Sequence, residues 1–189
     1  MGTWLQGAVV AAIVGSMLGS SAAPADTGKR LAYDFTFEAI EGGQMPLAQW
    51  RGKVLLVVNT ASFCGFTPQY AGLQALWQRY ENKGLIVIGV PANDFGGQEP
   101  NSEAEILGFC KGAYNVSFPL SSKQVVSGAQ AHPFYRWAVA ALGVGAAPKW
   151  NFHKYLVGRD GKLIAAFDTR VAPQAPELIK AIEAALARS

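Results

Sequence analysis

Cys64 and Cys110 are the only cysteines in this chain of 189 residues. Cys64 follows an apolar run, residues 54–58, and precedes a helix-like stretch that starts near Gln69. A sulfur at the amino end of a helix lies near unpaired N–H groups and the positive end of the helix dipole, which lower a thiol pKa. A thiolate can attack a peroxide O–O bond and become a sulfenic acid. An inert, packed Cys64 is the alternative, and position alone does not separate the two.

Three segments carry a family resemblance. The sequence NTASFCGFTPQY, residues 59–70, is similar to the active-site signature of the glutathione peroxidase family, with Cys64 where some members have selenocysteine. NDFGGQEP at 93–100 and KWNF at 149–152 resemble the second and third family signatures, in the family's order. The similarity extends from about Tyr33 to the end of the chain. It implies a thioredoxin-like fold and a thiol peroxidase.

The resemblance also implies a catalytic tetrad of Cys64, Gln98, Trp150 and Asn151. Two amide groups and an indole N–H are hydrogen-bond donors that can stabilise a thiolate and the oxygen leaving from a peroxide. Taken singly, the three donors could equally be a surface residue, a core aromatic and a turn residue. This cycle requires no cofactor, and the sequence suggests none.

Two positions depart from the usual family pattern. Ala92 stands where many members carry a cysteine, and Asp94 stands where a glutamine is common. The first removes a thiol outside the tetrad. The second is expected to alter the charge beside the site.

Cys110 has three possible roles: a structural disulfide with Cys64, no relation to Cys64, or attack on the Cys64 sulfenic acid. The resemblance implies the third, because Cys110 matches the resolving cysteine of thioredoxin-dependent family members. A helix cannot deliver its sulfur to Cys64 unless the two sites adjoin or the helix partly unwinds. Gly108 and Gly112 lower the stability of that helix. We therefore expect local unfolding around Cys110.

The substrate and partners follow from the same cycle. We expect a hydroperoxide substrate, either hydrogen peroxide or an organic or lipid hydroperoxide, and re-reduction by a thioredoxin-like protein or glutathione. Thr67 stands where a C-x-x-C motif would have its second cysteine, which argues against a thioredoxin-type disulfide oxidoreductase. The alternatives are a peroxide sensor that passes oxidation to a partner protein, and a non-catalytic binding domain of the same fold.

Other functional classes receive little support. The net charge is +3 and the basic residues are scattered, so we expect no nucleic-acid partner. His132 and His153 are the only histidines and lack partners at metal-ligand spacing, so we expect no metal. The connection at 143–148 is short where tetrameric family members have an extra segment, so the resemblance implies a monomer.

The amino-terminal segment suits export. Residues 8–18 form an uncharged apolar run that is short for a membrane span, and Ala23-Pro24-Ala25 offers a small-x-small cleavage site. We expect a signal peptide at 1–25, or an uncleaved membrane anchor, and one domain at 26–189. Both alternatives place the domain outside the cytosol, in the periplasm or secreted.

The remaining pattern predicts the elements that position these residues. A hairpin is expected from Tyr33 to beyond the turn at 41–44, followed by a central α/β sandwich with helices on both faces of a mixed sheet. The predicted strands are 54–58, 85–90, 152–157 and 163–167. The predicted helices are 69–82, 102–111 with a Ser102/Glu105 capping box, 133–142 and 177–187.

Overall fold

The computed structural model of the chain describes residues 1–2 and 30–188. The predicted signal segment, residues 1–25, lies outside this range except for its first two residues, so its export role stays a prediction. Within the described residues, no helix combines the length and apolar character needed to span a bilayer.

A four-stranded mixed sheet forms the centre of the molecule. Its strands are β3 (Val54–Thr60), β4 (Leu85–Pro91), β5 (Lys154–Val157) and β6 (Leu163–Phe167), in the spatial order β4-β3-β5-β6. β3 pairs parallel with β4, whereas β5 runs antiparallel to both β3 and β6. Every residue of β3 and β4 is buried, as expected for continuous apolar runs that are covered on both faces.

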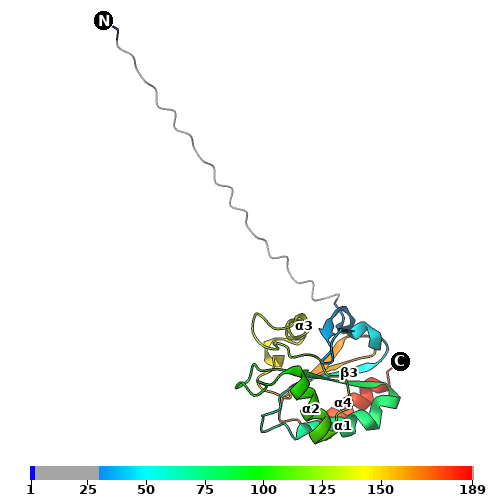
Figure 1. Cartoon of the computed structure of the whole chain (residues 1–189). Coiled ribbons are helices and arrows are strands. Elements are labelled where there is room, and N and C mark those ends of the chain that lie inside the picture. Colours follow the sequence, from blue (N-terminus) through cyan, green and yellow to red (C-terminus); the bar gives the residue numbers. More distant parts are fainter. Residues whose placement is uncertain (3–29, 189) are drawn as a thin grey trace.

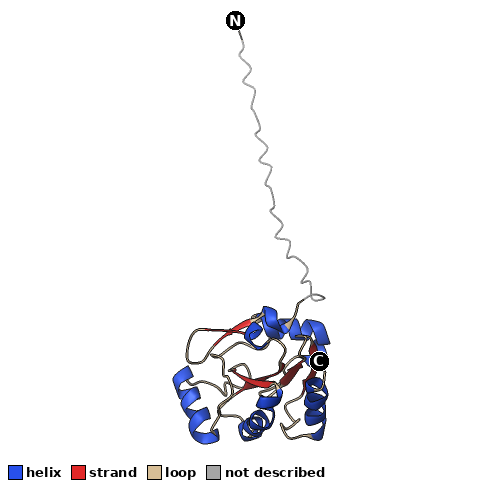
Figure 2. Cartoon of the chain, turned by 90° about the vertical axis from the view of Figure 1, so that its right-hand side faces the viewer, coloured by secondary structure: helices blue, strands red, loops and turns tan. Residues whose placement is uncertain are grey.

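Helices cover both faces of this sheet, which confirms the thioredoxin-like three-layer architecture. The helices are α1 (Gln69–Tyr80), α2 (Glu103–Tyr114), α3 (Pro133–Leu142) and α4 (Pro176–Leu186). In Figure 1, α1, α2 and α4 lie below β3 and α3 lies above it, and Figure 2 shows the strands between these two groups. One buried cluster joins α1, α2 and α4 to β3, and a second joins α3 to the opposite face of β3.

The amino-terminal hairpin is confirmed as a separate two-stranded sheet of β1 (Thr36–Glu38) and β2 (Gln44–Pro46). It begins later than predicted because the chain first forms a short 3-10 helix at Ala32–Asp34, where Asp34 accepts a hydrogen bond from the Leu31 N–H. Three other 3-10 helices lie at Leu47–Trp50, Glu81–Lys83 and Val144–Ala146.

Two predictions about helix and strand ends have different outcomes. The Ser102/Glu105 capping box of α2 is confirmed, with both reciprocal hydrogen bonds present. The prediction that Phe152 starts a strand is wrong. Phe152 has a left-handed backbone with φ 64°, and β5 begins only at Lys154. The residues before β5 therefore form a turn.

This turn lies at the chemically important edge of the sheet. β3 and β4 are parallel, so their carboxyl ends meet at one edge, and antiparallel β5 starts there. The first register pair between β3 and β5 at this edge is Val58 with Lys154. The loops that follow β3 and β4 and the turn that precedes β5 are thereby gathered together. These segments contain Cys64, Gln98 and Asn151, respectively.

Candidate active site

Cys64 lies in the turn between β3 and α1, where 7% of the residue is exposed. The Thr67 hydroxyl closes this turn by accepting from the Cys64 N–H at 3.0 Å and donating to the Ala61 carbonyl at 2.8 Å. The Phe66 N–H donates to the Cys64 sulfur, with 3.4 Å between nitrogen and sulfur. The local backbone therefore supplies one hydrogen-bond donor to the Cys64 sulfur.

The Gln98 loop is fastened to the Cys64 turn by two hydrogen bonds. The Phe63 N–H donates to the Gln98 carbonyl at 3.1 Å. The Ser62 hydroxyl donates to the Glu99 carboxylate, also at 3.1 Å. The residues beside Cys64 and beside Gln98 thus hold one another in register, although α1 and β4 lie between them in the sequence.

Gly96 lets the same loop pass close to two predicted site residues. Its φ is +68°, and a Cβ built on it would lie 3.6 Å from both the Gln98 side chain and the Trp150 ring. The indole of Trp150 lies 6.1 Å from the Phe95 ring, centroid to centroid, and 38% of Trp150 is exposed. Gln98 and Trp150 therefore flank one backbone segment, with the indole accessible to solvent.

Asn151 completes the group. It is fully buried, and its Nδ2 donates to Gln98 Oε1 at 2.9 Å. This bond orients the Gln98 amide with Oε1 toward Asn151, and Gln98 Nε2 remains a donor. The structure thus brings Gln98 and Asn151 into contact and places Trp150 beside Gly96 of the Gln98 loop, which is bonded to the Cys64 turn. That these residues act as a catalytic tetrad stays a prediction.

Cys110 lies on the inner side of α2, is completely buried and forms no disulfide with Cys64. Burial raises the pKa of the Cys110 thiol to about 11, with the Tyr70 hydroxyl opposing the shift and the Glu99 carboxyl adding to it. Tyr70 belongs to α1, so Cys110 faces that helix. In this conformation Cys110 is a protonated thiol without access to solvent.

Sequence analysis missed Glu99 and Ser62. Glu99 is fully buried, and burial raises the pKa of its carboxyl group, while hydrogen bonds from Ser62 oppose the shift. The only available signal was its position next to Gln98 in the second motif. A pattern read along the chain cannot show that a carboxylate reaches a serine in another loop.

Asp94 and Ala92, the two departures from the family pattern, lie in a hydrogen-bonded loop and in the apolar core, respectively. Asp94 Oδ2 accepts hydrogen bonds from the N–H groups of Val126 and Ser127 at 2.7 and 2.8 Å, and from the Ser127 hydroxyl at 3.0 Å. This carboxylate is therefore engaged with the 126–127 loop. Ala92 is fully buried in the core cluster on the α3 side of the sheet.

His132 caps a helix, and both histidines pack against aromatic rings. His132 Nδ1 accepts from the Phe134 N–H at 3.2 Å and caps α3, and its ring stacks on Phe37 at 4.3 Å. His153 is buried against Tyr155, with 4.7 Å between ring centroids. In residues 1–2 and 30–188, no three His, Cys, Asp or Glu side chains are grouped so that they could hold a metal ion.

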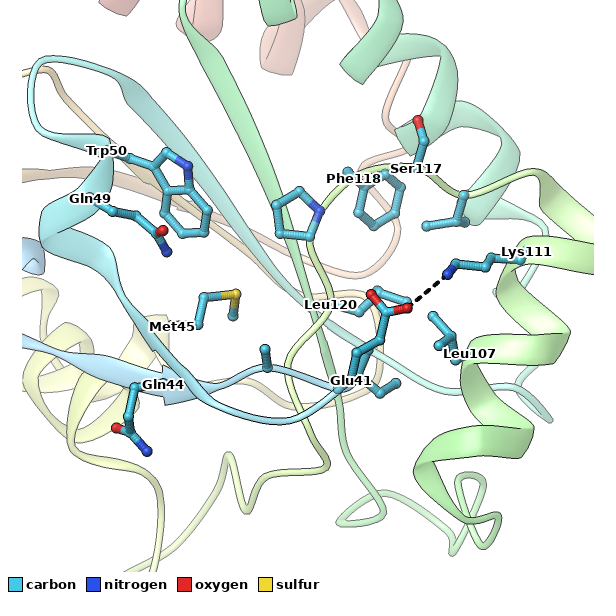
Figure 3. A pocket seen from close by; sticks show the side chains of 14 residues that line it. Glu41, Gln44, Met45, Gln49, Trp50, Leu107, Lys111, Ser117, Phe118 and Leu120 are labelled. Atoms are coloured by element: carbon cyan, nitrogen blue, oxygen red, sulfur yellow. Dashed lines mark hydrogen bonds and ion pairs between the residues drawn. The ribbon is translucent and has the colours of Figure 1, made fainter.

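A hollow of about 600 Å³ lies away from these residues, between the hairpin, α2 and the segment 116–120 (Figure 3). Leu107 and Lys111 of α2 line it, and Lys111 forms an ion pair with Glu41 across it at 3.1 Å. None of the predicted tetrad residues lines this hollow, so its size does not make it the reaction site.

Comparison with protein families relates residues 32–139 to the family model described as glutathione peroxidase. The chain is 46% identical over 149 residues to the hydroperoxy fatty acid reductase gpx1 of Synechocystis sp. The aligned region covers 75% of this chain and 88% of the relative. It is 44% identical over 145 residues to the glutathione peroxidase-like peroxiredoxin gpx1 of Schizosaccharomyces pombe, covering 75% and 91%, respectively.

Solved structures agree with this relationship. The crystal structure titled Trgpx in apo form superimposes with a TM-score of 0.67 and 35% identity, covering 85% of this chain and 97% of that one. A thioredoxin-family thiol:disulfide interchange protein from Chlorobium tepidum has a TM-score of 0.60 at 13% identity, over 81% and 93% of the two chains. This second likeness concerns the fold alone.

Proposed function

The chain belongs to the glutathione peroxidase family and is a thiol peroxidase, and we propose that Cys64 is its peroxide-reducing nucleophile. The Cys64 thiolate attacks the terminal oxygen of a hydroperoxide, ROOH. The S–O bond forms as the O–O bond breaks, and the leaving RO⁻ takes up a proton to become ROH. Sulfur is oxidised to the sulfenic acid and the peroxide is reduced.

One observation carries this proposal: the Cys64 turn is hydrogen-bonded directly to the loop that contains Gln98. In that loop, the side-chain Oε1 of Gln98 accepts a hydrogen bond from Asn151. The free Gln98 Nε2 and the Trp150 indole N–H are suited to stabilise the negative charge that develops on the leaving oxygen. Fixed donors need no reorganisation during the reaction, so they lower the barrier more than mobile water does.

We propose that Cys110 resolves the sulfenic acid. Its thiol attacks the Cys64 sulfur, a disulfide forms, and the sulfenic oxygen leaves as water. Because Cys110 is fully buried on the face of α2 that contacts α1, this step requires α2 to unwind locally. Only Ile106 and Cys110 of α2 are buried, and an added Cβ at Gly108 or Gly112 would meet nothing within 4 Å. This sparse packing favours local opening.

We also propose that a thioredoxin-like protein re-reduces the enzyme. A two-cysteine cycle ends in an internal disulfide, which suits a dithiol protein such as thioredoxin. Glutathione is the second candidate, and it would suit a cycle that leaves Cys110 unused. The relatives are named for peroxide reduction, so the sensor alternative is not favoured.

Exposed aromatic side chains around Cys64 support apolar hydroperoxides as substrates. Phe63 is 61% exposed and Phe66 is 36% exposed, on either side of Cys64 in sequence. Large exposed apolar groups next to a reactive centre mark a contact surface for an apolar ligand. Two relatives are named hydroperoxy fatty acid reductases, which supports the same substrate class.

We also propose that residues 1–25 direct export of the domain at 26–189, and that the short connection at 143–148 leaves the domain monomeric. Mass spectrometry of the protein recovered from outside the cytosol would give the amino-terminal residue. A mass that includes residues 1–25 would exclude cleavage. Light scattering of the purified protein would measure its oligomeric state.

The decisive experiment follows peroxide consumption by the purified protein with thioredoxin or glutathione as reductant. We expect Cys64→Ser to abolish consumption, and dimedone to label Cys64 in Cys110→Ser after one equivalent of peroxide. Undiminished turnover of Cys110→Ser with thioredoxin would exclude its resolving role. Undiminished turnover of Cys64→Ser would overturn the proposed function itself.

A further inference from the structure

The turn that carries Trp150 and Asn151 is held by its carbonyl groups. Each of the three consecutive carbonyls at 150–152 accepts a hydrogen bond from a buried side chain. The pairs are Asn59 Nδ2 to Trp150 O at 3.1 Å, Thr169 Oγ1 to Asn151 O at 2.8 Å, and Lys154 Nζ to Phe152 O at 2.7 Å.

This turn needs external support because its backbone is unfavourable. Phe152 has φ 64°, a left-handed conformation that a bulky aromatic residue rarely adopts, at a cost of order 1 kcal/mol or more. Such a conformation persists only where its surroundings hold it. The three side-chain donors supply that support at a point where the turn presents two predicted catalytic donors.

Thr169 joins this turn to the segment that follows Cys64, whereas Asn59 belongs to β3, which precedes Cys64. Its own carbonyl accepts a hydrogen bond from Gln69 Nε2 at 2.7 Å. Gln69 is the first residue of α1, the helix that follows the Cys64 turn. Thr169 is 4% exposed and lies after the end of β6, so it is not held there by strand pairing.

These contacts close a circuit around the reactive sulfur. From α1 the circuit runs through Gln69 to Thr169, from Thr169 to Asn151, and from Asn151 to Gln98. The Gln98 carbonyl then receives the Phe63 N–H, which returns the circuit to the residue before Cys64. The Thr169 hydroxyl is the link in this circuit between the carboxyl-terminal part of the chain and the donor pair.

We propose that Thr169 is a positioning residue of the peroxidase site, which sets the placement of Asn151, and through it Gln98, relative to the Cys64 sulfur. The inference rests on the proposed function of Cys64 and adds a residue outside the three sequence motifs. Loss of the hydroxyl frees the Asn151 carbonyl, so the Asn151 amide no longer fixes Gln98. A misplacement of about 1 Å in a catalytic group can lower a rate by up to about a hundredfold.

The test compares Thr169→Val, which keeps the shape and loses the hydroxyl, with Thr169→Ser, which keeps the hydroxyl. Stopped-flow fluorescence measures the second-order rate constant for oxidation of Cys64 by hydrogen peroxide. Iodoacetamide alkylation of Cys64, which has no oxygen leaving group, is measured at the same pH. We expect Thr169→Val to lower the peroxide rate constant at least about tenfold and alkylation less than about threefold. We expect Thr169→Ser to restore the peroxide rate constant to within about threefold of the wild-type value.

Two further variants keep the result decisive. Ser121→Ala removes another fully buried hydroxyl, bonded to the Ser122 carbonyl at 2.8 Å outside the circuit, and should leave both rate constants unchanged. Gln69→Met removes the other contact of Thr169 and is used if Thr169→Val fails to fold; it should lower the peroxide rate constant about threefold and leave alkylation unchanged. An unchanged peroxide rate constant in the folded variant, or an equal fall in both reactions, would overturn the positioning role. Absence of Cys64-dependent peroxide reduction in the wild type would instead overturn the proposed function.

Discussion

The side-chain amide of Asn151 donates to Gln98 Oε1 at 2.9 Å, and this contact decides which end of the Gln98 amide is free. With Oε1 turned toward Asn151, the other end of the Gln98 amide is its NH₂ group, which is a donor. The pair therefore behaves as a single donor unit beside the Cys64 turn. Asn151 is completely buried, so we expect it to act by orienting Gln98.

Replacing Asn151 by Asp tests this orientation. A carboxylate would repel Gln98 Oε1 and favour the flipped amide, which turns an oxygen toward the reacting sulfur. We expect the rate constant for oxidation of Cys64 by hydrogen peroxide to fall by about a hundredfold, as for loss of an oxyanion donor. Asn82→Asp, the same change at an exposed position, should leave the rate constant unchanged. A fall of less than threefold in Asn151→Asp would contradict the orienting role.

Stiffening α2 should slow formation of the disulfide between Cys64 and Cys110. Gly108 and Gly112 have open space where a Cβ would lie, so alanine at either position stabilises the helix by about 1 kcal/mol without a clash. We expect each change to slow disulfide formation by about fivefold after one equivalent of peroxide, and to leave Cys64 oxidation unchanged. Quenched-flow thiol counting measures both steps.

Gly145→Ala is the matched control for this experiment. Its added Cβ would also meet nothing within 4 Å, and it lies in the 3-10 helix at Val144–Ala146, outside α2. Disulfide formation should keep its wild-type rate. If the α2 variants also react at the wild-type rate, unwinding of α2 is not required for resolution.

The exposed aromatic rim should discriminate between peroxides. Phe63→Ser removes a large apolar contact from a residue that is 61% exposed next to Cys64. We expect kcat/KM for a hydroperoxy fatty acid to fall by about tenfold, chiefly through KM, because burying one such side chain against a ligand contributes about 1.5 kcal/mol. The value for hydrogen peroxide should not change. Val144→Ser, at an 86% exposed position outside the site, serves as the control, and equal losses with both peroxides would argue against the apolar rim.

Lys154 predicts a pH dependence of stability. Burial lowers the pKa of Lys154 from 10.5 to about 7, opposed by the charge of Asp168. Between about pH 7 and pH 10 the unfolded chain binds the proton that the folded chain has released, so this group makes stability rise with pH in that window. Below pH 7 the lysine is charged in both states and its contribution is constant and unfavourable.

Lys154→Met should remove this dependence. From pH 7 to pH 9, the free energy of unfolding of the wild type should rise by about 2 kcal/mol relative to the variant, as measured by urea denaturation. Lys180→Met, at an exposed position, controls for loss of a lysine. A difference between wild type and Lys154→Met that does not vary with pH would show that burial of this lysine carries no such cost.

The sequence by itself determined the architecture and the family, and it supplied the candidate reactive residues. The apolar runs at 54–58 and 85–90 are too continuous for a one-sided sheet, so they required helices on both faces. The signature around Cys64 and the motifs containing Gln98 and Asn151 gave the family. These features are local, since each depends on neighbouring residues or on a short periodic pattern.

Only the tertiary structure decided how these residues are held. The hydrogen bonds from Ser62 to Glu99 and from Thr169 to Asn151 join residues that are 37 and 18 positions apart in sequence. The left-handed backbone of Phe152 was likewise hidden, because an aromatic residue before an apolar run normally indicates a strand. A side chain that bonds to a distant backbone group leaves no periodicity, and its partner is fixed only when the strands and helices are packed.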